Sequence, residues 1–132
     1  MTLEESLYAR LNGYAGLTAL VAARIYPMSM EQNPTLPLVT YRRIGGTPDQ
    51  KFGGTAGIGN PVFSVTSWGE TYKSARATAA QVRAALNVSM AALGGTGGVN
   101  AQIERITEGI DLKDPDTGWY YTTEDYVIHV QE

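Results

Sequence analysis

PVFSVTSWGETYKSARATAAQVRAAL, residues 61–86, decides the fold class because two different periodicities meet in it. Its first part, Pro61–Trp68, is rich in β-branched and aromatic residues, which predicts a strand. After Gly69, Thr71 is placed to cap a helix. Apolar residues then recur at helical spacing on one face, namely Tyr72, Ala75, Ala79, Val82 and Leu86. A strand followed at once by an amphipathic helix predicts that the helix packs on a sheet.

Weaker signals on both sides complete the order of elements. At the N-terminus, Thr2 and Glu5 have the spacing of a capping box, and Leu3, Leu7 and Leu11 follow at helical spacing. A short second helical piece is indicated by Leu17–Val21. A further strand, a hairpin and its turn are predicted by the remaining segments, which are Leu38–Ile44, Ile103–Lys113, Asp114–Gly118 and Trp119–Val130.

These elements predict an α+β fold with the order α-β-β-α-β-β. We expect a mainly antiparallel sheet of about four strands with the helices packed on one face, because hairpin-type links outnumber the one helical link. The length of 132 residues suits one domain, 1–132.

Two glycine-rich segments are predicted to be flexible. Residues 45–60 hold six of the fifteen glycines and only two large apolar side chains, Phe52 and Ile58. Such a segment cannot build a core of its own, and long loops within domains are commonly functional or disordered. A second flexible link is expected at 91–100.

Composition excludes several classes of protein. The net charge of −3 and the pI near 5.1 argue against a dedicated nucleic-acid binder, which needs a basic field. Without cysteine there is no disulfide, thiolate metal site or cysteine nucleophile. The first residues lack the pattern of a signal peptide, and no apolar run reaches the roughly 20 residues that span a bilayer. We therefore expect a soluble protein, made in a cytoplasm, with no membrane contact.

No motif predicts catalysis. The glycines of 53–59 precede a strand and lack the Lys-Ser/Thr pair of a phosphate-binding loop. Asp114, Asp116 and Gly118 are out of register with a calcium loop, so a turn is favoured. His129 is the only histidine. We expect no catalytic residues, no cofactor, no metal, and a protein that is not an enzyme.

Surface residues instead suggest contacts between proteins. A basic helix face can meet a partner, although solvated helix faces carry such residues anyway. Three consecutive aromatic residues after the turn are more than core packing readily explains, and Trp and Tyr are enriched at interfaces. The candidate interface residues are Arg42, Arg43, Lys51, Phe52, Ile58, Lys73, Arg76, Arg83, Trp119, Tyr120 and Tyr121.

The order of these segments resembles the tail-terminator family, the tail completion or head–tail joining proteins of long-tailed bacteriophages and related prophage elements. The segments that carry the resemblance are Leu3–Leu11, Gly16–Val21, Arg24–Pro27, Leu36–Tyr41, Gly45–Pro48, Ser67–Tyr72, Ala75–Leu86 and Asp111–Tyr120. Together they cover nearly the whole chain. No single one is diagnostic, and residues 93–99 are looser than the family pattern.

The resemblance implies an α+β fold and a homo-oligomeric ring, a hexamer, on the head-proximal end of the tail tube. Such a ring stops tube polymerisation and forms the surface that joins the head. Its partners would be the tail tube protein and head–tail connector or neck proteins, and DNA would pass through its lumen without specific binding. The location would be the virion tail, after assembly in the host cytoplasm.

Two alternatives remain. Another phage neck or head–tail connector protein would share this size and composition. A small-ligand-binding module, or an enzyme whose site forms between subunits, would need convergent polar groups in a pocket, and the sequence shows no such set.

Overall fold

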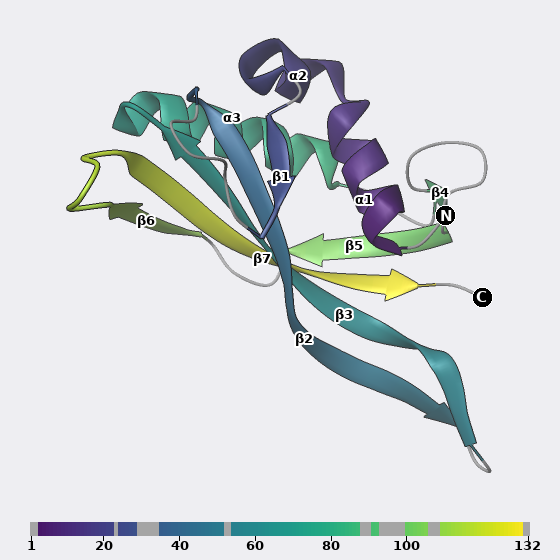
Figure 1. Ribbon diagram of the computed structural model, residues 1–132. Coiled ribbons are helices and arrows are strands. Elements are labelled where there is room, and N and C mark those ends of the chain that lie inside the picture. The colour runs from purple at the N-terminus through teal and green to yellow at the C-terminus, as the bar shows by residue number, and fades with distance from the viewer. Residues whose placement is uncertain are drawn as a thin grey trace.

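The computed structural model describes residues 3–22, 24–28, 35–51, 54–87, 91–92, 100–105 and 109–130. These residues form an α+β fold in which three helices lie against one twisted sheet (Figure 1). The helices are α1 Leu3–Asn12, α2 Ala15–Val21 and α3 Tyr72–Ala85. The strands are β1 Ile25–Pro27, β2 Leu38–Lys51, β3 Gly54–Gly69, β4 Ala91–Ala92, β5 Asn100–Arg105, β6 Ile110–Lys113 and β7 Tyr120–Val130.

The sheet has the order β1-β2-β3-β7-β5-β4, and β6 also pairs with β7. Among the described strands only β1 and β2 run parallel, so the predicted class and the mainly antiparallel sheet are confirmed. The expected number of about four strands is corrected to seven among the described residues. Two of the additional strands, β1 and β4, are edge strands of two or three residues, too short to give a sequence pattern.

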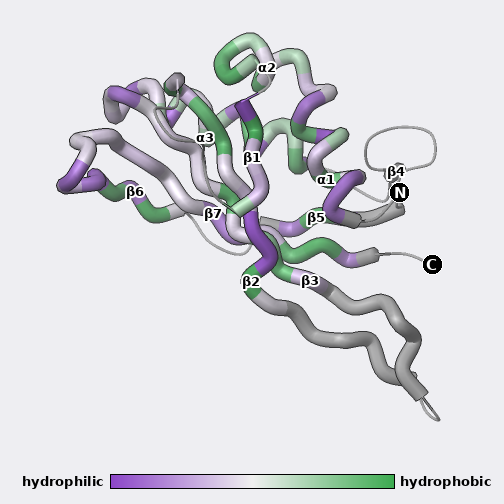
Figure 2. The backbone as a smooth tube through the Cα atoms, in the orientation of Figure 1, coloured by the Kyte–Doolittle hydropathy of each residue, from purple (hydrophilic) through white to green (hydrophobic). Residues whose placement is uncertain are grey.

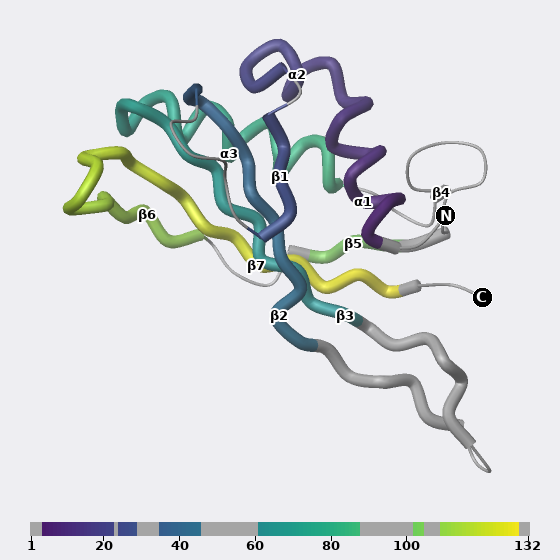
Figure 3. The backbone as a smooth tube through the Cα atoms, in the orientation of Figure 1, coloured from purple at the N-terminus to yellow at the C-terminus, as the bar shows by residue number. Residues whose placement is uncertain are grey.

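The predicted strand Ile103–Lys113 is divided into β5 and β6, which lie beside opposite ends of β7 (Figure 3). Arg105 pairs with Tyr126 and Ile110 pairs with Thr123. Between these two pairs the chain advances five residues from β5 to β6 but only three residues along β7. The two extra residues interrupt the ladder. Gly109 lies in this interruption with a φ of +97°, a backbone conformation that glycine adopts without steric cost.

The predicted loop at 45–60 is corrected to a hairpin. The strand β2 continues to Lys51 and β3 begins at Gly54, with backbone pairing from Gly45–Val62 to Lys51–Gly54. Ladder hydrogen bonds between the two strands do not depend on large side chains, which is why counting apolar residues gave the wrong structure. We call residues 45–51 and 54–61 the arm. Its predicted flexibility stays a prediction.

The second predicted link, 91–100, lies mainly outside the described residues. Its two ends belong to β4 and β5, which pair with each other. Phe52 also lies outside the described residues, and the structure describes only the backbone at Lys51 and Ile58.

The helices cover one face of the sheet, as predicted. Thr71 caps α3, its hydroxyl accepting a hydrogen bond from the Ser74 amide at 3.1 Å. One core joins the helices to this face, and burying each of its large side chains contributes about 1.5–3 kcal/mol. Its largest members include Leu7, Leu11, Leu17, Val21, Val39, Phe63, Val65, Val82, Leu86 and Ile128.

The short β6 is attached to α3 through Asp111. The Thr122 hydroxyl donates to Asp111 Oδ1 at 2.8 Å, the Tyr72 hydroxyl to Oδ2 at 3.0 Å, and Arg76 Nη1 to Oδ1 at 3.3 Å. The hydrogen bond from Thr122 is the main reason why the pKa of Asp111 is lowered, and the bonds from Tyr72 and Arg76 act in the same direction. In return, the hydrogen bond to Asp111 raises the pKa of Tyr72. Asp111 therefore joins β6, β7 and the start of α3.

Replacing Gly69 with alanine should destabilise the fold. An added Cβ would lie 2.5 Å from the Ala75 backbone nitrogen and 2.9 Å from Ser74 Cβ, so α3 would have to move away from β3. Overpacking of this kind typically costs about 1–3 kcal/mol. Urea unfolding should show that loss for Gly69→Ala and less than about 0.5 kcal/mol for Lys73→Ala, at an exposed position in the first turn of α3. Equal stability of Gly69→Ala and wild type would contradict this close packing.

The Asp111 contacts should make stability depend on pH. Because the pKa of Asp111 is lower in the folded state than its ordinary value of 3.8, the carboxylate contributes stability that is complete well above pH 3.8. That contribution is lost as the pH falls through the folded-state pKa. The free energy of unfolding of Asp111→Asn should thus fall less steeply than that of wild type on acidification below about pH 5. Glu70→Gln, at an exposed residue, is the control; parallel pH profiles for Asp111→Asn and wild type would refute the assignment.

Candidate functional site

Strand register divides the side chains of the sheet between two faces. Phe63, Val65 and Tyr126 belong to the face covered by helices. The opposite side, which we call the open face, carries three cross-strand rows. They are Leu38–Trp68–Tyr121–Leu112, Thr40–Thr66–Thr123–Ile110 and Arg42–Ser64–Asp125. Within these rows Leu38, Thr40 and Ser64 are buried, so the other side chains form the exposed part of the open face.

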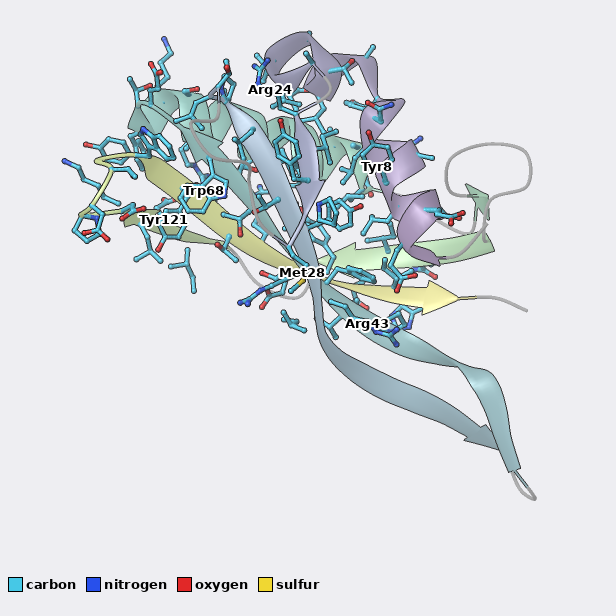
Figure 4. All side chains as sticks on the ribbon, in the orientation of Figure 1. Tyr8, Arg24, Met28, Arg43, Trp68 and Tyr121 are labelled. Atoms are coloured by element: carbon cyan, nitrogen blue, oxygen red, sulfur yellow. The ribbon has the colours of Figure 1, made fainter. Side chains whose placement is uncertain are left out.

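An aromatic pair dominates the open face. The rings of Trp68 and Tyr121 stack with centroids 4.6 Å apart and planes inclined by 30°, and Figure 4 shows the two side chains next to each other. Trp68 Nε1 donates to Thr40 Oγ1 at 3.2 Å, and the Thr66 and Thr123 hydroxyls lie 3.1 Å apart. These contacts fix the aromatic surface in place, so it offers area to a partner at little entropic cost.

A shallow groove of about 280 Å³ runs beside this pair. Its lining mixes hydroxyl, aromatic and cationic groups, from Met28, Thr40, Tyr41, Arg42, Ser64, Thr66, Trp68, Tyr121 and Thr123. Hydroxyl groups and flat rings suit contact with a protein surface. Among the described residues, no group of three or more potential metal ligands occurs.

Large apolar side chains are exposed around the open face. Met28 is 71% exposed at one side, and Ile110 and Leu112 are 58% and 48% exposed on β6 at the other. Figure 2 shows the apolar segments of β6 next to the hydrophilic turn that leads to β7. Apolar groups gathered on one uncovered surface are typical of a binding surface. The open face and β6 are therefore our candidate site.

The basic helix face is partly used within the chain. Arg83 Nη2 lies 3.0 Å from Glu124 Oε2, and the Glu124 side chain is only 3% exposed while that of Arg83 is 41% exposed. Arg76 is paired with Asp111 as described above. Lys73 is exposed at the first turn of α3. Arg76 and Arg83 thus have structural roles on the covered side of the sheet.

The two arginines of β2 separate as alternation predicts. Arg42 lines the groove on the open face. Arg43 turns to the helical side, where its Nη1 lies 3.8 Å from Glu4 Oε1 in an exposed ion pair. Exposed pairs of this kind typically contribute about 0–1 kcal/mol. Arg43 thus has an acidic partner in the same chain.

The three consecutive aromatic residues have different surroundings. Tyr121 stacks on Trp68 in the open face. Tyr120 contacts Tyr72 edge to face with a centroid distance of 6.3 Å, and Lys113 Nζ lies 5.3 Å from its ring centroid. Trp119 is half-buried just before β7. Of the three, Tyr121 is the one that joins the candidate site.

Sequence reasoning missed most members of the site, among them Trp68, Met28, Ile110 and Leu112. The alternation of Ile110 and Leu112 with Asp111 and Lys113 could have indicated a strand with one apolar face. The sequence did not indicate that Met28 lies at the site, because the position of Met28 follows from a backbone turn after Pro27 in which Met28 has φ +68°.

Comparisons with known proteins agree with this architecture. The family model described as tail completion protein gp17 matches residues 5–130. Seven chains of solved structures match as well. One, from a structure titled "Virion of native gene transfer agent (GTA) particle", has a TM-score of 0.71 and 19% identity and covers 98% of this chain and 95% of its own. That match shows a shared fold.

No curated protein matches the chain. Within the described residues, none of the helices has the length and apolar character needed to cross a membrane. The family match nevertheless extends over nearly the whole chain and confirms both the resemblance seen in the sequence and the predicted location in the virion tail. The chain belongs to the family of tail completion protein gp17.

Proposed function

We propose that this protein is a structural component of the virion that forms a ring on the head-proximal end of the tail tube. The ring stops polymerisation of the tube and provides the surface to which the head is joined. The open face is the observation that carries this proposal, because it leaves an organised, partly apolar surface of the sheet for a partner. Membership of the tail completion family supports the same role.

Its partners are other copies of the chain, the tail tube protein and a head–tail connector or neck protein. A hexamer is proposed from the family resemblance. Closed rings are built from heterologous contacts, in which one patch of a subunit meets a different patch of the next. The open face, the exposed side of α3 and the arm supply patches of different chemistry on one chain.

The proposed relation to DNA is passage through the lumen without specific binding. The chain carries a net charge of −3, and Arg76 and Arg83 are paired with carboxylates of the same chain. Each phosphate contact made by a free cation would slow the passage of DNA. A slightly negative net charge, with arginines paired inside the chain, therefore suits a channel that DNA must leave.

Placing a charge in the open face should impair ring formation without unfolding the subunit. Met28→Asp is suitable because Met28 is highly exposed and has φ +68°, a conformation that aspartate tolerates better than most residues. We expect self-association to weaken by at least about tenfold, since a charge would be buried without a partner. Light scattering over a concentration series, with and without tube protein, measures the effect.

Leu20→Asp is the matched control, because Leu20 is exposed on α2, on the helical side. It should assemble nearly as well as wild type. If Met28→Asp assembled as well as wild type, the open face would not be part of the interface. A wild-type chain that stays monomeric and ignores tube ends would refute the terminator role altogether. Binding to a neck protein alone would favour the connector alternative.

The arm should be needed for assembly and not for folding. Among the described residues, the strand segments within 47–60 pair only with each other, so 47–60 can be replaced by Asn-Gly, a two-residue connection that suits a tight hairpin between Gly46 and Pro61. The thermal midpoint should change by only a few degrees, within about 5 °C. Ring formation, followed by sedimentation and negative-stain microscopy, should be lost or strongly reduced. Normal rings from the shortened chain would disprove a role for the arm.

A further inference from the structure

The strand β6 has an open outer edge. In the part of the chain that the structure describes, β7 is the only strand that pairs with β6. All four residues of β6 are exposed, and Ile110 and Leu112 lie on the open face. An uncovered apolar edge strand is a template for pairing with another strand unless something protects it. The outer edge of β6 is therefore suited to pairing with another strand.

The arm presents the complementary feature. The strand β7 pairs with β3 only from Val62 to Gly69, and β1 pairs with β2 only from Val39 to Tyr41. Beyond these limits, within the described residues, the two strands of the arm are bonded only to each other, from Gly46–Pro61 to Lys51–Gly54. A hairpin of two strands is at best marginally stable alone in water. Both of its outer edges can accept a third strand.

These two features lie at opposite corners of the sheet. The strand β6 lies beside Tyr120–Thr123 of β7, which pair with Thr66–Gly69 of β3. The arm leaves the sheet at the other end of β3, beyond Val62, where it continues both β2 and β3 (Figure 1). One subunit therefore cannot join its own arm to its own β6 while the sheet is intact, but two subunits placed head to tail can.

We propose that the outer edge of β6 pairs with an edge of the arm of a second copy, which continues the sheet from subunit to subunit. This inference rests on the proposed ring. Main-chain hydrogen bonds supply the attachment, and Ile110 and Leu112 pack on the added strand. A second copy is the occupant because each subunit then provides one donor strand and one acceptor edge, the heterologous arrangement that a ring repeats.

The chain has no cysteine, so engineered disulfides can test the pairing. One preparation carries Leu112→Cys, and three others carry Thr47→Cys, Asp49→Cys or Thr55→Cys in the arm. Residues opposite each other on paired strands have Cβ atoms about 4.5–5.5 Å apart, close enough for a disulfide after small adjustment. Each arm variant is mixed with Leu112→Cys, assembled and oxidised mildly.

At least one mixture should give a disulfide-linked dimer in at least about tenfold excess over the same mixture made with Leu20→Cys, because assembly raises the effective concentration of the two thiols. Thermal unfolding of each variant establishes that it is folded. In a second measurement, Leu112→Lys should abolish ring assembly while Leu20→Lys retains it, since a lysine on an edge strand opposes strand addition.

The outcomes separate this inference from the proposed function. Rings that form normally but give no excess cross-link at any arm position would overturn the pairing and leave the ring intact as a proposal. A cross-link from residue 112 to tube protein in place of a second copy would overturn it as well. If the wild-type chain forms no ring with or without tube protein, both the function and the pairing fail.

Discussion

The pairing of β3 with β7 is the constraint on which the rest of the structure depends. Its register sets Val62–Gly69 against Tyr120–Val127 and so decides which side chains meet the helices. With Phe63 opposite Tyr126, the apolar residues of both strands share the covered face and close one core with α3. A slip of β7 by one residue would turn its apolar side chains, Tyr126 among them, to the opposite face, while Phe63 of β3 stayed under the helices. The same register aligns Trp68 with Tyr121, so it builds the open face together with the core.

The elements with strong local signals were predictable from the sequence. The strand at 61–68, the helix from Thr71 and the hairpin around Asp114–Gly118 follow from periodicity, capping and turn chemistry. The strands of the arm were not predictable in this way. Their pairing is made by the backbone of two glycine-rich segments, and hydrophobic patterning reports burial of side chains rather than hydrogen bonding. The interruption near Gly109 depends likewise on a register that only the partner strand defines.

The candidate site was predicted less well than the fold, for a related reason. Residue type indicated that Arg76 and Arg83 could meet a partner, but it could not reveal Asp111 and Glu124, which are 35 and 41 positions away in sequence. The aromatic cluster drew attention to Tyr121, which stacks on Trp68 in the candidate site, while Trp68 was assigned only to its strand. The chemical character of each side chain can be read from the sequence. Whether that side chain is paired within the fold or available to a partner depends on contacts between distant segments.

The ion pairs within the chain affect which surfaces are available to the proposed ring. Because Arg83 and Arg76 hold α3 to β7 and β6, the covered side of the sheet is closed by its own ion pairs. In the proposed ring, association would use the open face, the arm and the outer edge of β6. In a closed ring the rotation between subunits is set by the angle between the two patches that meet. Here the arm is a continuation of β3, and β6 is bonded to β7, so the β3–β7 ladder fixes that angle. The interaction that orders the core of one subunit would thus also determine how many subunits close the ring.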